Sequence, residues 1–140
     1  MTNRNLCMMT SRRLPAAVLA VSLLITAARA AVQTWTGGGG DNLWTTPGNW
    51  SGGAVPGAAD TAVLAEADGD IVLDAAFAGT IKELVLTAAF TNTLTLERPL
   101  VVGHAYAQTN GTFTAGANTV QVGQQATTAA GYFTLAGGVF

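Results

Sequence analysis

The chain has 140 residues, of which 49% are hydrophobic and 10% are charged, and its formal net charge is −2. This length allows one domain at most. The weak acidity and the lack of a basic stripe argue against a nucleic-acid partner. A single cysteine excludes an internal disulfide and any multi-cysteine metal site, and a single histidine excludes paired-histidine zinc motifs.

Residues 1–30 predict a secretory signal peptide. A positively charged start that contains Arg12 and Arg13 precedes residues 14–28, which carry no charge, and Ala28 and Ala30 have the spacing of a cleavage site. The alternative is a transmembrane helix, but a bilayer span takes roughly 20 apolar residues and this stretch is shorter. We therefore expect cleavage after Ala30, by either the general secretory or the twin-arginine route.

Removal of the signal peptide would leave an acidic chain. Four of the six basic residues lie in residues 1–30, so Lys82 and Arg98 remain against all eight acidic residues, a net charge of −6. The cysteine and all three methionines also lie in the signal. A chain without disulfides must be stabilised outside the cell by its own packing or by continuing into more protein.

From residue 61 onward, short runs rich in β-branched residues and leucine alternate with turn residues. No run has the helical period of 3.6, and residues 75–78 are too few for a helix before Gly79. The sequence therefore predicts an all-β chain. The expected strands are 61–64, 70–74, 81–86, 93–96, 100–103, 111–115, 119–123 and 131–135.

An internal period of twenty residues is visible near the C-terminus. A shift of twenty places Gly103 on Gly123, Gly111 on Gly131, Phe113 on Phe133 and Thr114 on Thr134, and it aligns the apolar residues Leu100, Val120 and Phe140. Twenty residues is the size of one coil of a parallel β-helix. We therefore expect residues 65–140 to form repeats of a right-handed parallel β-helix, or solenoid. An antiparallel β-sandwich with coincidental turn spacing is the alternative.

Three tryptophans, Trp35, Trp44 and Trp50, lie in a glycine-rich segment, residues 31–64. One interpretation is an N-terminal cap, in which large aromatic rings cover the open core of the first coil and glycines allow tight turns. The alternative is a carbohydrate-binding or carbohydrate-active secreted module that stacks these tryptophans on sugar rings. In a cap, polar side chains would accept hydrogen bonds at turns, namely those of Asp41, Asn49 and Asp60.

The tryptophans belong to the pattern W-x-GGGGD-x-x-W-x-x-x-x-NW-x-x-x-x-x-P-x-x-x-D-x-A. This pattern resembles the N-terminal region of bacterial autotransporter-type β-helical surface proteins, in particular those with autotransporter-associated β-strand repeats. The resemblance covers residues 34–64 closely. Residues 65–140 share with the family only the repeated short strands and glycine turns. It implies a β-helical passenger displayed at or beyond the outer membrane. Because an autotransporter ends in a translocator barrel and this chain stops at Phe140, it also implies a truncated passenger with an uncapped last coil.

Other polar residues give weaker signals. Residues 37–40 are all glycine but lack the Gly-Lys-Ser/Thr ending of a phosphate-binding loop. His104 has no nucleophile motif nearby and is predicted to be a turn residue after a strand that ends at Gly103. Lys82 and Glu83 are adjacent in a predicted strand, so we expect them on opposite faces and not as an ion pair.

Four acidic residues follow the tryptophan segment. They lack the residue pattern of a calcium loop, so a solvated turn between strands is the favoured interpretation. These residues are Glu66, Asp68, Asp70 and Asp74.

The sequence thus predicts an exported, non-enzymatic surface protein segment with a structural or adhesive role. It predicts no catalytic, cofactor-binding or metal-binding residues, no cofactor and no nucleic-acid partner. A surface polysaccharide, or a host or neighbouring cell surface, is the expected kind of partner. The uncapped end is expected to continue into further repeats or to self-associate, and the expected location is secreted or at the cell surface, associated with the outer membrane.

Overall fold

The computed structural model describes residues 29–66, 69–123, 125–128 and 132–134, so the predicted signal peptide up to Ala28 lies outside the described residues. The described chain is all-β, with one short 3-10 helix, η1 (Pro47–Asn49). Its strands are β1 (Val32–Thr34), β2 (Thr61–Leu64), β3 (Ile71–Leu73), β4 (Thr80–Leu86), β5 (Thr93–Leu96), β6 (Leu100–Gln108), β7 (Thr112–Thr114), β8 (Val120–Val122), β9 (Gln125–Thr128) and β10 (Tyr132–Thr134).

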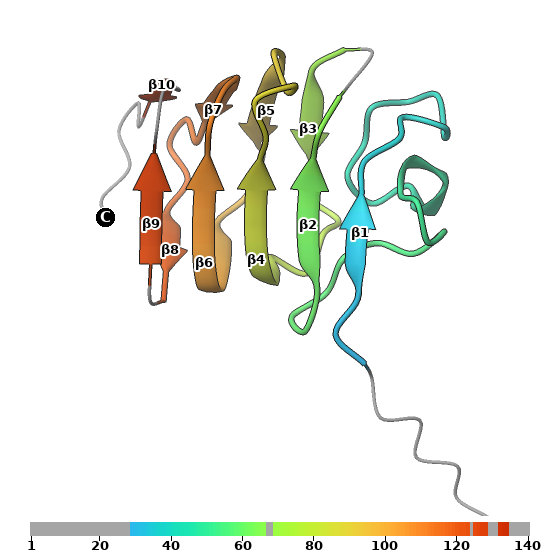
Figure 1. The fold of residues 1–140 in the computed structure, drawn as a ribbon, viewed down its shortest axis with the longest axis horizontal. Coiled ribbons are helices and arrows are strands. Elements are labelled where there is room, and N and C mark those ends of the chain that lie inside the picture. The colour runs from blue at the N-terminus through green and yellow to red at the C-terminus, as the bar shows by residue number, and fades with distance from the viewer. Residues whose placement is uncertain (1–28, 67–68, 124, 129–131, 135–140) are drawn as a thin grey trace, which may run out of the picture.

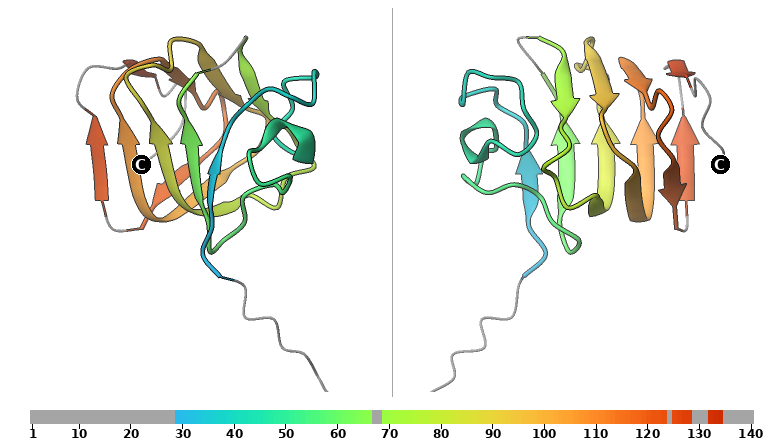
Figure 2. Two further views of the ribbon diagram at one scale, coloured as in Figure 1. Left: turned by 45° about the vertical axis from the view of Figure 1, so that its right-hand side comes forward. Right: turned by 180° about the vertical axis from the view of Figure 1, so that it is seen from behind.

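The strands form two sheets, and the chain passes repeatedly from one to the other (Figures 1 and 2). The first sheet has the order β1-β2-β4-β6-β8, with β9 also paired to β6. The second sheet has the order β3-β5-β7-β10. Every pairing between these strands is parallel. The antiparallel sandwich alternative is therefore wrong for the described residues.

Strand pairing repeats along the chain with nearly the predicted period. Phe113 pairs with Phe133 and Thr114 with Thr134, which confirms the predicted correspondence at those positions. Earlier in the chain the interval is slightly longer, because Thr61 pairs with Glu83 and Leu64 with Leu86. The predicted pairs that involve Gly131 and Phe140 lie outside the described residues.

The core lies between the two sheets and follows from the alternation of side chains along each strand. Leu64 and Leu86 pair in adjacent strands of the first sheet, and both are fully buried. Leu73 and Leu96 pair in the second sheet and are also buried. Burial of one such side chain stabilises the fold by about 1.5–3 kcal/mol. Buried apolar side chains therefore form ladders that run from each of these strands to its neighbour in the same sheet.

Strand β6 differs from the prediction. The sequence predicts a strand that ends at Gly103 and a turn at His104, but β6 continues through His104 to Gln108. Ile81 pairs with Val102 and Glu83 with Ala105, so Gly103 and His104 lie opposite Lys82 alone. This β-bulge bends the strand and interrupts the alternation of inward and outward side chains. The turn prediction for His104 is therefore wrong.

Candidate functional site

The three tryptophans lie together in the core. Trp35, Trp44 and Trp50 are 3%, 0% and 2% exposed. The ring centres of Trp44 and Trp50 are 4.6 Å apart with planes at 71°, and those of Trp35 and Trp50 are 5.1 Å apart at 90°. Phe77, from the loop after β3, lies 5.7 Å from Trp44. Edge-to-face packing of this kind is the preferred arrangement of aromatic rings in protein interiors.

This packing lacks the geometry that a sugar-stacking platform requires. Such a platform presents two or more exposed and roughly coplanar rings. The rings of Trp35, Trp44 and Trp50 are buried, and the two pairs that are in contact are steeply inclined to each other. In addition, the Trp50 Nε1 donates a hydrogen bond to the backbone oxygen of Trp44 at 2.8 Å, so this donor is already used within the tryptophan cluster.

Polar side chains hold the loop around the tryptophans in shape. Asn49 is fully buried, and its Oδ1 accepts a hydrogen bond from Gly39 N at 2.7 Å. Its Nδ2 donates to Asp41 Oδ1 at 2.8 Å and to Leu43 O at 2.9 Å. The Thr46 hydroxyl, together with the backbone N–H of Leu43 and the amide of Asn49, outweighs a small effect of burial and lowers the pKa of Asp41.

Asp60 also accepts hydrogen bonds from backbone N–H groups, near the start of the described chain. Its Oδ1 accepts from Ala31 N and its Oδ2 from Gly57 N, at 2.8 and 2.9 Å. The prediction that Asp41, Asn49 and Asp60 accept hydrogen bonds at turns is therefore confirmed.

One segment, residues 42–52, covers the first edge of both sheets. On the first sheet, Ser51 N donates to Thr34 O at 2.9 Å, and Gly52 N donates to the buried Gln33 Oε1 at 2.9 Å. On the second sheet, Trp44 N donates to Val72 O at 2.9 Å. Val72 N in turn donates to Asn42 O at 3.0 Å. Backbone groups that would otherwise be open for pairing with another strand are thus occupied.

A buried carboxylate joins this segment to the loop after β3. Asp74 is 8% exposed, and its carboxylate accepts hydrogen bonds from Thr45 N at 3.0 Å and from Thr45 Oγ1 at 2.9 Å. Burial raises the pKa of Asp74, but the bonds from Thr45 and from Ala76 N outweigh it, so the pKa is lowered overall. The charged form of Asp74 is therefore the one that stabilises this contact.

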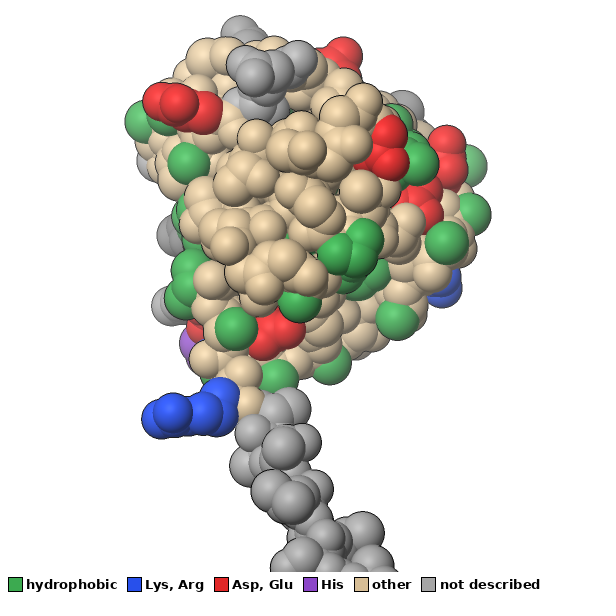
Figure 3. Space-filling model, turned by 90° about the vertical axis from the view of Figure 1, so that its right-hand side faces the viewer, with side chains coloured by type: hydrophobic (Ala, Val, Ile, Leu, Met, Phe, Trp, Pro, Cys, Tyr) green, Lys and Arg blue, Asp and Glu red, His purple; other side chains and the backbone are tan. Residues whose placement is uncertain are grey.

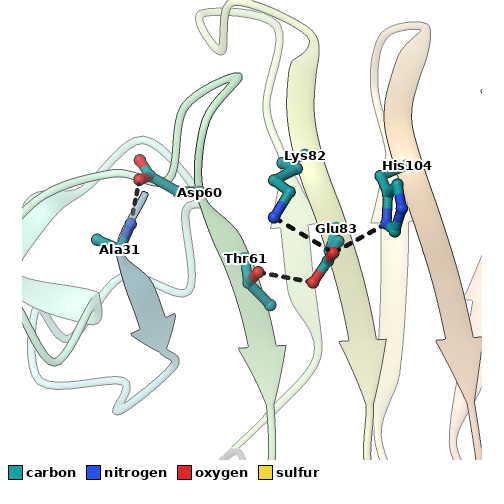
Figure 4. A network of polar contacts seen from close by, with 6 residues as sticks. All are labelled: Ala31, Asp60, Thr61, Lys82, Glu83 and His104. Atoms are coloured by element: carbon teal, nitrogen blue, oxygen red, sulfur yellow. Dashed lines mark hydrogen bonds and ion pairs between the residues drawn. The ribbon is translucent and has the colours of Figure 1, made fainter. Parts of the chain in front are cut away.

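A second polar group lies on the outer side of the first sheet, at the β-bulge (Figure 4). Glu83 Oε2 accepts a hydrogen bond from Thr61 Oγ1 at 2.9 Å. Glu83 Oε1 lies 2.9 Å from His104 Nδ1 and 3.5 Å from Lys82 Nζ. The Thr61 hydroxyl is the largest cause of the lowered pKa of Glu83, and the neighbouring charge of Lys82 adds to it against a desolvation effect.

This arrangement corrects the prediction for Lys82 and Glu83. The two side chains form an ion pair although they are adjacent in a strand, because the bulge disrupts the regular alternation of faces. The group joins β2, β4 and β6, three successive strands of the first sheet. Chemically it is an imidazole beside a carboxylate, with the one hydroxyl of the group, from Thr61, bonded to the carboxylate.

The solvated turn predicted for the acidic residues is wrong for Asp74, which is 8% exposed and bonded to Thr45. Asp68 lies outside the described residues. Asp70 Oδ1 accepts from Thr93 N at 2.8 Å, while Asp74 bonds Thr45. Among the described residues, no three histidine, cysteine, aspartate or glutamate side chains are grouped so that they could hold a metal ion.

Viewed from the side of β1, the surface consists mainly of backbone and uncharged polar atoms, with scattered acidic and hydrophobic side chains (Figure 3). Within the described ranges, no helix is both long and apolar enough to cross a membrane.

Comparison with known proteins gives no relative. No family model matches the chain, and neither a curated protein nor a solved structure matches it.

Proposed function

We propose that this chain is the exported N-terminal part of a bacterial surface protein, with a structural or adhesive role and no catalysis of its own. In this proposal residues 1–30 direct export, residues 31–64 form a cap, and the remaining residues form coils that are displayed outside the inner membrane. The resemblance of residues 34–64 to autotransporter-type passengers supports the assignment, as does the signal-like N-terminus.

The proposed architecture is a right-handed parallel β-helix. Two sheets of parallel strands, visited in turn by the chain, are what such a helix would produce. The pairing of Thr61 with Glu83, and of Leu100 with Val120, joins positions that lie about one coil apart in the sequence.

The observation that carries the proposal is the double edge contact of residues 42–52. One segment occupies the leading edge of β1 through Ser51 and the leading edge of β3 through Trp44, while the buried rings fill the core between the two sheets. A protein that starts a stack of coils needs this arrangement, because an open first coil would expose both apolar side chains and strand edges. The partner of such a stack would be a surface polysaccharide or the surface of a host or neighbouring cell.

Fractionation of the native host, followed by N-terminal sequencing, tests the export step. The expected product lies outside the inner membrane and begins at Ala31. A Leu24→Arg variant, which interrupts the apolar run, should accumulate as a precursor inside the cell, whereas the matched Leu24→Val variant should be exported normally. Recovery of wild-type chain as an uncleaved cytoplasmic protein would contradict the proposal.

Adhesion is tested separately, by comparing the attachment of host cells with and without the gene to polysaccharide-coated and cell-coated surfaces. Loss of attachment without the gene supports an adhesive role. Unchanged attachment on every surface, with the protein correctly exported, leaves the structural role and removes the adhesive one.

A further inference from the structure

Several turns of the chain are tied to an earlier turn by a side chain. In each case the side chain donates a hydrogen bond to a backbone carbonyl that lies about one coil earlier in the sequence. We call these contacts the turn ties. They join Thr87 Oγ1 to Ala65 O, Arg98 Nη1 to Ala75 O, Asn110 Nδ2 to Ala88 O and Asn118 Nδ2 to Leu96 O.

Two of the turn ties are chemically alike. Asn110 and Asn118 each use the side-chain amide, across the same sequence interval, with distances of 3.1 and 2.9 Å. They differ in their surroundings, because the Asn110 tie is exposed and the Asn118 tie is partly buried. They also differ in the residue that follows, which is Gly111 in the first case and Thr119 in the second.

The fold requires glycine at position 111. Gly111 is buried and has φ +79°, a left-handed conformation that glycine adopts without steric cost. A Cβ atom at this position would overlap the Phe90 ring and lie 2.9 Å from Phe90 O. A residue with a side chain would strain this turn, so the fold favours glycine after Asn110.

We propose that Asn110 is a site of spontaneous deamidation, a covalent modification that removes one turn tie. The nitrogen of Gly111 attacks Asn110 Cγ. The new N–C bond forms as the Cγ–Nδ2 bond breaks, and ammonia leaves with the proton lost from Gly111 N. Water then opens the cyclic imide at either carbonyl, which gives aspartate or isoaspartate. Only water is consumed, and no enzyme or oxidant is needed.

Sequence and structure favour this reaction at Asn110 over Asn118. The attacking nitrogen must approach the side chain of the preceding residue, and a Cβ on its own residue hinders that approach. Gly111 has no Cβ, whereas Thr119 has a branched one. The tie to Ala88 O is also exposed, so it can open to solvent more readily than the partly buried tie of Asn118.

The modification has a structural consequence. The amide donor at Asn110 becomes a carboxylate, which accepts hydrogen bonds and cannot donate one to Ala88 O when ionised. The tie is therefore lost and a negative charge is placed beside a carbonyl oxygen. The turn that contains Ala88 should become more mobile.

Storage of the full chain at neutral and mildly alkaline pH, followed by peptide mapping with an isoaspartate-specific label, tests the proposal. We expect Asn110 to be converted severalfold faster than Asn118, with isoaspartate among the products and a rate that rises with pH. An Asn110→Gln variant should lose the labelled product, because glutamine would need a larger ring. Equal rates at Asn110 and Asn118, or an intact Asn110, would overturn the proposal.

The structural consequence has its own test. In hydrogen-exchange measurements, an Asn110→Asp variant should exchange faster around Ala88 than wild type, while exchange around Leu96 stays unchanged. If exchange around Ala88 does not change in this variant, the proposed loss of the tie is wrong, whatever the rate of deamidation.

Discussion

Replacement of Trp44 by alanine should remove the centre of the N-terminal cluster. Trp44 is 0% exposed and contacts both Trp50 and Phe77. A buried aromatic side chain of this kind covers about 150–250 Å², and truncation of a core tryptophan to alanine costs about 3–5 kcal/mol. Small domains have total unfolding free energies of about 5–15 kcal/mol, so this loss is a large fraction of the stability.

Chemical denaturation followed by circular dichroism measures this loss, and the neighbouring residue supplies the control. Leu43→Ala should cost much less, because Leu43 is 38% exposed. Trp44→Phe should lie between the two, since the Trp44 Nε1 has no hydrogen-bond partner in the described structure and only ring area is lost. Trp44→Ala should also self-associate more than wild type and Leu43→Ala in size-exclusion chromatography, because residues 42–52 would no longer hold the first sheet edges closed. If Trp44→Ala is as stable as Leu43→Ala and self-associates no more than it does, the assignment of a cap is refuted.

Three further predictions concern Gly111, Asp74 and the exposure of the three tryptophans. Gly111→Ala should lower stability by at least about 1–3 kcal/mol more than Gly116→Ala in denaturation experiments, because both glycines have positive φ but only Gly111 lacks room for a Cβ; equal losses would contradict this. Because folding lowers the pKa of Asp74 from its ordinary value of 3.8, the stability that Asp74 contributes is present above that value and is lost as pH falls through the lowered pKa. Asp74→Asn should therefore lose less stability than wild type between neutral and acidic pH, and parallel pH profiles would argue against this. Iodide should quench tryptophan fluorescence only weakly and without any effect of added polysaccharide, since all three rings are at most 3% exposed; strong quenching that sugar relieves would favour a binding platform.

Strand positions could be predicted where burial alternates along a short run. Thr61–Leu64 and Thr93–Leu96 match the predicted boundaries, because both alternate partly exposed and buried side chains. Strand β1 was missed, since its three residues lie in a segment dominated by glycine and tryptophan. Strand β9 was also missed, because it follows β8 almost at once and its glutamine, alanine and threonine residues give no apolar alternation.

The contacts of the bulge could not be predicted from local pattern. Regular alternation places Lys82 and Glu83 on opposite faces, and Gly103-His104 looks like a turn. The true arrangement depends on how β4 pairs with β6, whose residues are distant in the sequence. The period was visible only late in the chain for a related reason. The pairing of Thr61 with Glu83 spans a slightly longer interval than that of Leu100 with Val120, so no single shift aligns the whole chain.

The turn ties have a consequence for the order in which the chain acquires structure. Each donor comes later in the sequence than its acceptor, as with Asn118 and Leu96 or Thr87 and Ala65. A chain that emerges from a pore with its N-terminus first therefore presents every acceptor before the donor that needs it. In that direction, each new turn closes on an earlier turn that is already in place. If the chain emerged with its C-terminus first, each donor would be exposed before its acceptor.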